Sequence, residues 1–217
     1  MPVRILLADD HEIVRRGLRA ILEAQADWQV TDEAANGLEA VEKAERTKPD
    51  LVVMDISMPG MNGLEAARRI RLSHPGVEVL FLTMHESEQM IREGIDAGAR
   101  GYLLKSDAGI DLVTAVKSVS RHRPFFSHQI AGPDSPSREG RNQSKVRGQG
   151  RASVLTSRER EVVQLLAEGK STKEVASALQ IAVKTAATHR TNILRKLGLH
   201  SIADLVRYAI RNRIVEV

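Results

Sequence analysis

Short apolar runs alternate along the first half of the chain with segments in which apolar residues recur at helical spacing. The runs at 3–8, 28–30, 51–54, 77–82 and 101–104 are bounded by polar or turn residues, as buried strands of a parallel sheet are. Apolar residues recur every three or four positions in the segments 13–22, 38–44, 64–70, 90–95 and 110–119, which predicts helices. This alternation predicts an α/β fold with a doubly wound, five-stranded parallel sheet.

The last part of the chain has only helical patterns. Three Ser/Thr-x-x-Asp/Glu sequences, each typical of a helix start, occur at Thr156 with Glu159, Ser171 with Glu174, and Ser201 with Asp204. A further helix is expected at 183–197, after a tight turn at Gln180 and Ile181. A short helix, a tight turn and a longer helix within a four-helix unit predict a helix-turn-helix.

A polar segment separates these two parts. Residues 124–153 are rich in Gly, Ser and Arg and contain few apolar side chains, so they cannot bury enough surface to offset the entropy of ordering them. We therefore expect a domain at 1–123, a flexible linker at 124–153 and a second domain at 154–217.

Charge differs between these segments. Their net charges are −4, +3 and +5 in chain order, so the basic second domain favours nucleic acid as its partner. The absence of cysteine excludes disulfides and thiolate metal sites, and the seven histidines are scattered, so no zinc site is expected. No apolar run approaches the ~20 residues of a membrane span, and no secretory leader starts the chain. We expect a soluble cytoplasmic protein.

Polar residues follow four of the predicted strands. Asp9 and Asp10, Asp55, Thr83 and Lys105 each stand where a strand ends. Taken singly, such an aspartate is usually a helix cap and such a lysine a surface residue. Because carboxyl ends of parallel strands share one edge of the sheet, we expect these side chains to converge. Three carboxylates there require a cation, and Mg²⁺ suits oxygen ligands together with a phosphoryl group. The pattern predicts that Asp55 accepts a phosphoryl group.

These residues, with Tyr102 three positions before the lysine, resemble a response-regulator receiver domain over roughly residues 3–121. The resemblance implies that a histidine kinase phosphorylates Asp55. The implied roles are Mg²⁺ binding by Asp9, Asp10, Asp55 and the carbonyl of Ser57, phosphoryl binding by Lys105, and a conformational switch at Thr83 and Tyr102.

The longer helix of the predicted helix-turn-helix has two contrasting faces. Ala186, Ile193 and Leu197 share an inner face, and a basic, hydroxyl-rich stripe lies opposite. The candidate DNA contacts on this helix are Lys184, Thr185, Ala187, Thr188, Thr191 and Arg195.

The segments 155–161, 166–171 and 189–199 resemble the LuxR-type DNA-binding domain, over about residues 154–213. The whole chain is thus similar to the NarL/FixJ class of response regulators. This resemblance implies a transcriptional regulator that binds double-stranded DNA as a homodimer and is not an enzyme in the usual sense. Ala182 stands where the family often has a capping serine, and Ala187 where a polar side chain is common. His189 is expected to be structural.

Two alternatives are weaker. A phosphatase of the haloacid-dehalogenase kind also uses an aspartyl nucleophile, but it requires a second carboxylate two residues later, where this chain has Ser57. Such an enzyme would also leave the DNA-binding tail unexplained. A receiver that signals by protein contact without phosphate is disfavoured by the complete acidic pocket.

Overall fold

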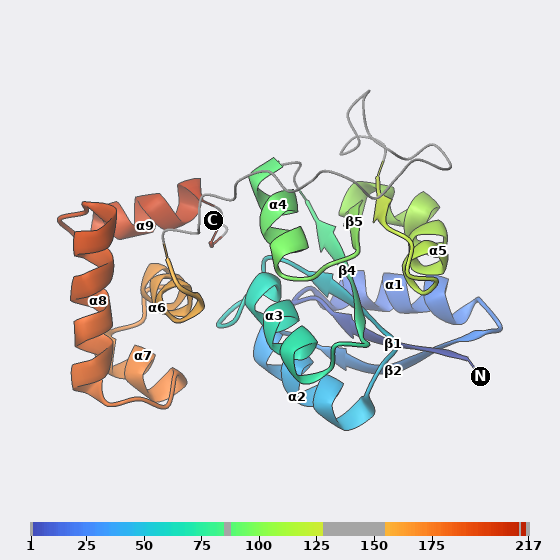
Figure 1. The fold of residues 1–217 in the computed structure, drawn as a ribbon, viewed down its shortest axis with the longest axis horizontal. Coiled ribbons are helices and arrows are strands. Elements are labelled where there is room, and N and C mark those ends of the chain that lie inside the picture. The colour runs from blue at the N-terminus through green and yellow to red at the C-terminus, as the bar shows by residue number, and fades with distance from the viewer. Residues whose placement is uncertain (1, 85–87, 128–154, 213, 216–217) are drawn as a thin grey trace. The chain divides into compact units, whose positions relative to one another are not determined.

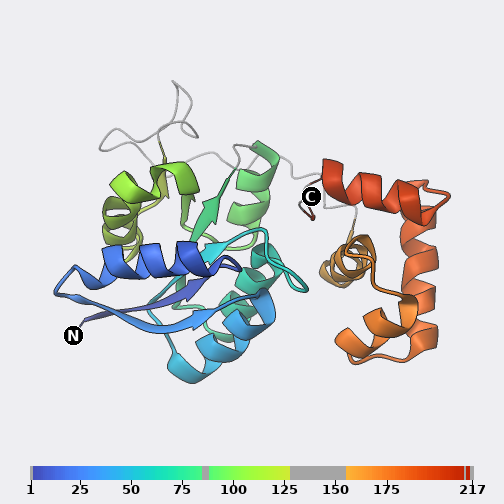
Figure 2. The ribbon, with the colours of Figure 1, turned by 180° about the vertical axis from the view of Figure 1, so that it is seen from behind.

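The computed structural model describes residues 2–84, 88–127, 155–212 and 214–215. The chain divides into two compact units, Met1–Asn142 and Gln143–Val217, whose folds appear in Figures 1 and 2. The predicted linker, 124–153, lies outside the described residues from position 128 onward. Its flexibility and the exact domain boundaries therefore remain predictions.

The first unit alternates strands and helices as the apolar pattern predicts. Its elements are β1 (Val3–Ala8), α1 (Glu12–Glu23), β2 (Trp28–Ala34), α2 (Gly37–Thr47), β3 (Leu51–Asp55), α3 (Gly63–Ser73), β4 (Glu78–Thr83), α4 (Glu88–Asp96), β5 (Gly101–Leu104), the 3₁₀ turn η1 (Lys105–Asp107), α5 (Ala108–Val119) and β6 (Phe125–Phe126). The strands form one parallel sheet in the order β2-β1-β3-β4-β5-β6.

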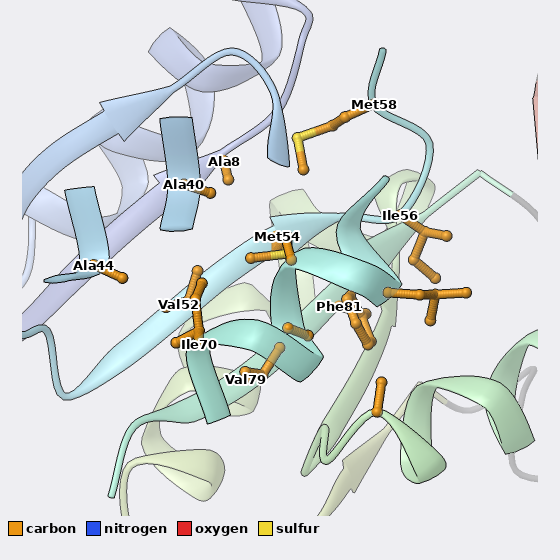
Figure 3. Packing of buried hydrophobic residues seen from close by; sticks show 14 of the residues in the cluster. Ala8, Ala40, Ala44, Val52, Met54, Ile56, Met58, Ile70, Val79 and Phe81 are labelled. Carbon is orange, nitrogen blue, oxygen red and sulfur yellow. The ribbon is translucent and has the colours of Figure 1, made fainter. Parts of the chain in front are cut away.

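Helices cover both faces of this sheet. On one face α1 and α5 bury a cluster that includes Leu22 and Val116, and on the other α2, α3 and α4 bury a cluster that includes Phe81. Figure 3 shows this second cluster, to which β3 contributes Val52 and Met54 and α3 contributes Ile70. Both β3 and β4 are buried at every position, which explains why Leu51–Met54 and residues 79–82 are continuously apolar rather than alternating.

The doubly wound parallel fold is confirmed, but the predicted number of strands is wrong. A sixth strand, Phe125–Phe126, pairs with β5, and the Ser127 amide donates to the Tyr102 carbonyl at 3.0 Å. Two residues are too few to produce a recognisable strand pattern. This strand falls inside the segment predicted as linker, so order in the sheet extends beyond residue 123.

The described part of the second unit contains α6 (Ser157–Ala167), α7 (Thr172–Ala178), α8 (Val183–Leu197) and α9 (Ile202–Arg211) around one apolar core. The predicted capping boxes form at Thr156 and Ser171, whereas at Ser201 the side chain accepts from the Asp204 amide without a complete box. Ala182 gives α8 no side-chain cap. No helix in the described ranges is both long and apolar enough to cross a membrane.

The connection from β3 to α3 requires a glycine. The Gly63 amide donates to the Ile56 carbonyl at 2.9 Å, which draws the start of α3 against the end of β3. A Cβ atom at position 63 would lie 2.0 Å from the carbonyl oxygen of Asp55. Only a residue without a side chain permits this approach, so Gly63 helps to fix the loop that follows Asp55.

Gly63→Ala should therefore lower the free energy of unfolding of the first unit by about 2–3 kcal/mol, because backbone must move to admit the methyl group. Gly17→Ala is the matched control, since a Cβ there meets nothing within 4 Å and alanine favours the helix by ~0.5–1 kcal/mol. Urea unfolding followed by fluorescence of Trp28, the only tryptophan, measures both. Equal stabilities of the two variants would contradict the close approach.

Candidate functional site

Acidic side chains from two strands meet at the carboxyl edge of the sheet. Asp9 follows β1 directly, Asp10 comes next, and Asp55 is the last residue of β3. One ligand atom from each of these three residues and from His11 lies within 4.8 Å of the others. Asp9 and Asp55 are only 1% and 3% exposed, so these two carboxylates are largely removed from water. The predicted convergence of these three carboxyl groups is therefore observed.

Lys105 joins the cluster from a third strand. It begins η1, immediately after β5, and its ammonium lies 2.7 Å from Oδ2 of Asp9 and 2.7 Å from Oδ2 of Asp55. Burial opposes the charge of Lys105, but the carboxylates of Asp55 and Asp9 outweigh burial and raise its pKa above the usual value. One ammonium thus bridges two buried carboxylates that would otherwise repel each other.

Asp55 differs from an ordinary surface aspartate in its protonation. Burial raises the pKa of Asp55 to about 6, although the charge and hydrogen bond of Lys105 act in the opposite direction. Nearby Asp9 adds to the rise, and the Ser57 amide, which donates to Oδ1 of Asp55 at 3.3 Å, reduces it. At neutral pH Asp55 is therefore an ionised, poorly hydrated carboxylate, which is a suitable state for a nucleophile.

The sequence interpretation missed His11. Its Nδ1 lies 2.9 Å from Oδ1 of Asp10 and 3.3 Å from Oδ1 of Asp9, and its amide donates to Asp9. The available signal was adjacency, because His11 directly follows the two aspartates and precedes α1. The imidazole remains 64% exposed, so it stands at the rim of the cluster.

The donor set of this cluster fits Mg²⁺. Three carboxyl groups face one ammonium, which leaves the pocket with a surplus of negative charge once Asp55 is ionised. Carboxylate oxygens predominate over the single imidazole, as a hard divalent cation prefers. The carbonyl of Ser57 is the additional ligand expected from the sequence, and this role stays a prediction.

The two expected switch residues lie on β4 and β5, the strands that follow β3 in the sheet. Thr83 ends β4 one position beyond Leu82, which pairs with Asp55, and it is 3% exposed. Tyr102 is buried in β5 with its ring centroid 5.9 Å from that of Phe81. A Cβ at Gly94 of α4 would lie 2.9 Å from the Tyr102 ring, so this glycine makes room for the inward tyrosine.

In the second unit, α8 presents all six candidate DNA contacts at exposed positions. Ala186 and Ile193, on the opposite side, are buried in the core of the unit. The turn before α8 contains Gln180 in the left-handed region, with φ of 53°. α7, this turn and α8 have the order and the exposed helical face of a helix-turn-helix. Whether these side chains contact DNA stays a prediction.

A doubly wound sheet with a buried aspartate beside lysine, followed by a helix-turn-helix unit, defines a class of phosphorylation-controlled DNA-binding proteins. Family models agree: the response regulator receiver domain matches residues 5–117, and the luxR family of bacterial regulatory proteins matches residues 153–209. The chain belongs to the two-component response regulators with a LuxR-type DNA-binding domain.

Individual relatives share this organisation. The response regulator protein VraR of Staphylococcus aureus is 37% identical over 216 residues, which cover 100% of both chains. A solved two-component response regulator of the LuxR family from Aurantimonas sp. SI85-9A1 is 39% identical, with a TM-score of 0.58 over 60% of this chain and 94% of that one. The RcsB response regulator of Salmonella typhimurium is 25% identical, with a TM-score of 0.57 over 95% and 97% of the two chains. The predicted family is thereby confirmed, and so is the predicted function of a regulator that combines a receiver domain with a LuxR-type DNA-binding domain.

Asp55→Asn should stabilise the first unit at neutral pH. The pKa of Asp55 rises from 3.8 to about 6 on folding, so the folded state binds the proton more tightly and the wild type loses stability as pH rises through this interval. The advantage of Asp55→Asn should be ~1 kcal/mol near pH 4.5 and grow to ~2–3 kcal/mol above pH ~7.

Urea unfolding of full-length protein between pH 4.5 and pH 8, followed through Trp28, tests this dependence. Asp27→Asn, which removes an exposed carboxylate before β2, is the control for the change in charge. A constant difference between Asp55→Asn and wild type across this range would contradict the raised pKa.

Proposed function

We propose that a histidine kinase transfers a phosphoryl group to Asp55, and that this transfer controls DNA binding by α8. The observation that carries the proposal is the setting of Asp55: a buried carboxylate, 2.7 Å from the ammonium of Lys105 and clustered with two further carboxyl groups. Both family models support the same division of labour between the two units.

The chemistry assigns separate tasks to the residues of the cluster. In the transfer, a bond forms between an Asp55 oxygen and phosphorus, and the bond from phosphorus to a kinase histidine nitrogen breaks. Asp9, Asp10, Asp55 and the carbonyl of Ser57 would hold Mg²⁺, which neutralises charge on the phosphoryl oxygens when bound. Lys105 would pair with a phosphoryl oxygen, because its ammonium already faces the reacting carboxylate.

The response to phosphorylation would begin at Thr83 and Tyr102. Thr83 ends the strand beside β3 and could follow the new phosphoryl oxygens, while Tyr102 lies under α4 against Phe81. Tyr102 pairs with Phe126 of β6, so a change in β5 would act on the last described strand before the predicted linker. For phosphorylation to switch the protein, the phosphoryl group must stabilise one packing arrangement of Thr83 and Tyr102 more than the other.

DNA recognition would use α8 in the major groove. The basic second unit provides charge for phosphate contacts, and two copies of the protein would occupy half-sites about one helical turn apart. Lys184 and Arg195 are proposed as phosphate contacts at the two ends of the exposed stripe of α8.

Acetyl phosphate with Mg²⁺ should add one phosphoryl group to the full-length protein, detected by intact mass. Asp55→Asn should abolish the addition, because it removes the proposed acceptor oxygen, whereas the control Asp27→Asn should keep it, because Asp27 is exposed and lies outside the acidic cluster. Removal of Mg²⁺ with a chelator should abolish labelling of the wild type, since uncompensated carboxylates repel the donor. Labelling of Asp55→Asn at the wild-type level would refute the assignment.

Arg195→Ala should weaken binding to specific and random duplexes by a similar factor, roughly three- to tenfold. It should also make the salt slope, which is the slope of log K against log salt concentration, less steep by about one, because one fewer counterion is released. A phosphate contact carries charge but no sequence information, which is the reason for the equal loss. The control is Arg121→Ala, which removes one exposed positive charge from the first unit. Fluorescence anisotropy at several salt concentrations measures both, and an unchanged slope would exclude this role for Arg195.

A further inference from the structure

The outward stripe of α8 has charge only at its ends. At about 100° per residue, Lys184, Ala187, Thr188, Thr191 and Arg195 lie opposite the buried face of the helix. All five are exposed. The centre of the stripe therefore consists of one alanine and two threonines, none of which bears a formal charge.

Both threonine hydroxyl groups are turned toward the helix backbone. Oγ1 of Thr188 donates to the carbonyl of Lys184 at 2.9 Å, and Oγ1 of Thr191 donates to the carbonyl of Ala187 at 3.1 Å. Threonine in a helix commonly makes this bond to the residue four positions earlier. Because the hydroxyl hydrogen is used in this bond, the γ-methyl group is the apolar part of each exposed threonine that remains for contact with a ligand.

The N-terminal part of α8 continues this apolar character. Val183, one helical turn before Ala187, is 47% exposed although its side chain is wholly apolar. Ala182, before the helix, is also exposed, and Ala187 has only its Cβ methyl to present. Methyl groups thus extend along α8 from Val183 to Thr191.

We propose that α8 reads DNA sequence mainly through contacts between these methyl groups and the 5-methyl groups of thymine in the major groove. Thymine carries the apolar substituent of that groove, and alanine and threonine methyl groups are suitable partners for it. The inference rests on the proposed role of α8 as the recognition helix, and it specifies the ligand as a half-site with thymines opposite Ala187, Thr188 and Thr191.

A polar alternative uses the same two threonines. Each hydroxyl oxygen keeps lone pairs that could accept a hydrogen bond from the amino group of adenine or cytosine. Ala187 cannot take part in such readout, because it has no polar side-chain atom. The two modes differ in which half of the threonine side chain is needed, the methyl group or the oxygen.

The experiment begins with selection of duplexes from a random-sequence pool by full-length protein treated with acetyl phosphate and Mg²⁺. In the selected site each thymine is then replaced by deoxyuridine, which removes only the 5-methyl group. We expect two or more positions per half-site at which this replacement weakens binding, roughly three- to tenfold each, with no change in salt slope.

Paired substitutions then identify the protein groups. Thr188→Val and Thr191→Val keep a methyl group and remove the oxygen, so specific binding should stay within about twofold of wild type. Thr188→Ser and Thr191→Ser keep the oxygen and remove the methyl group. They should lose affinity for the thymine site and become insensitive to deoxyuridine at one position.

The outcomes separate this inference from the proposed function. Selection of no preferred sequence would refute sequence-specific DNA binding and the inference together. A preferred site that lacks thymine, tolerates deoxyuridine throughout, or is lost with valine but kept with serine would overturn methyl readout and leave the proposed function standing.

Discussion

The bridge from Lys105 to Asp9 and Asp55 is the interaction on which the functional edge of the sheet depends. These three residues come from the ends of three different strands, and the ammonium lies 2.7 Å from each carboxylate. Two unit charges 4 Å apart interact by on the order of 4 kcal/mol at an effective dielectric constant of 20. The lysine therefore makes it possible to hold ionised carboxylates together where little water reaches them.

This bridge also connects stability with reactivity. Burial that leaves Asp55 poorly hydrated raises its pKa, and the same burial strengthens its attraction to Lys105. The backbone carbonyl of Asp55 lies against Gly63, so the start of α3 is packed directly on the residue that carries this carboxylate. The raised pKa shows that the charge of Asp55 is costly to keep in this setting, even with Lys105 beside it.

In the second unit, contacts on the inner and lateral faces of α8 leave its outer face available. Ile193 is fully buried, Lys196 pairs with Glu159 of α6 at 2.7 Å, and Arg190 donates to Thr172 of α7 at 3.3 Å. These interactions hold the helix in place without using the outward stripe. Ala187 and Thr188 are exposed on the outward stripe, so packing in the core constrains their side chains less than it constrains Ile193.

The sequence by itself determined the architecture and most of the acidic cluster. Apolar periodicity is a local property, so it located the strands and helices. The rule that the carboxyl ends of parallel strands share one edge of the sheet then predicted that Asp9, Asp55 and Lys105 converge. Tertiary structure alone decided the pairing of Phe125–Phe126 with β5, the place of His11 at the rim of the cluster, and the inward packing of Tyr102. The pairing of Phe125–Phe126 and the packing of Tyr102 depend on residues distant in sequence, and the place of His11 depends on its rotamer. Distant contacts and rotamers leave no periodic signal in the sequence.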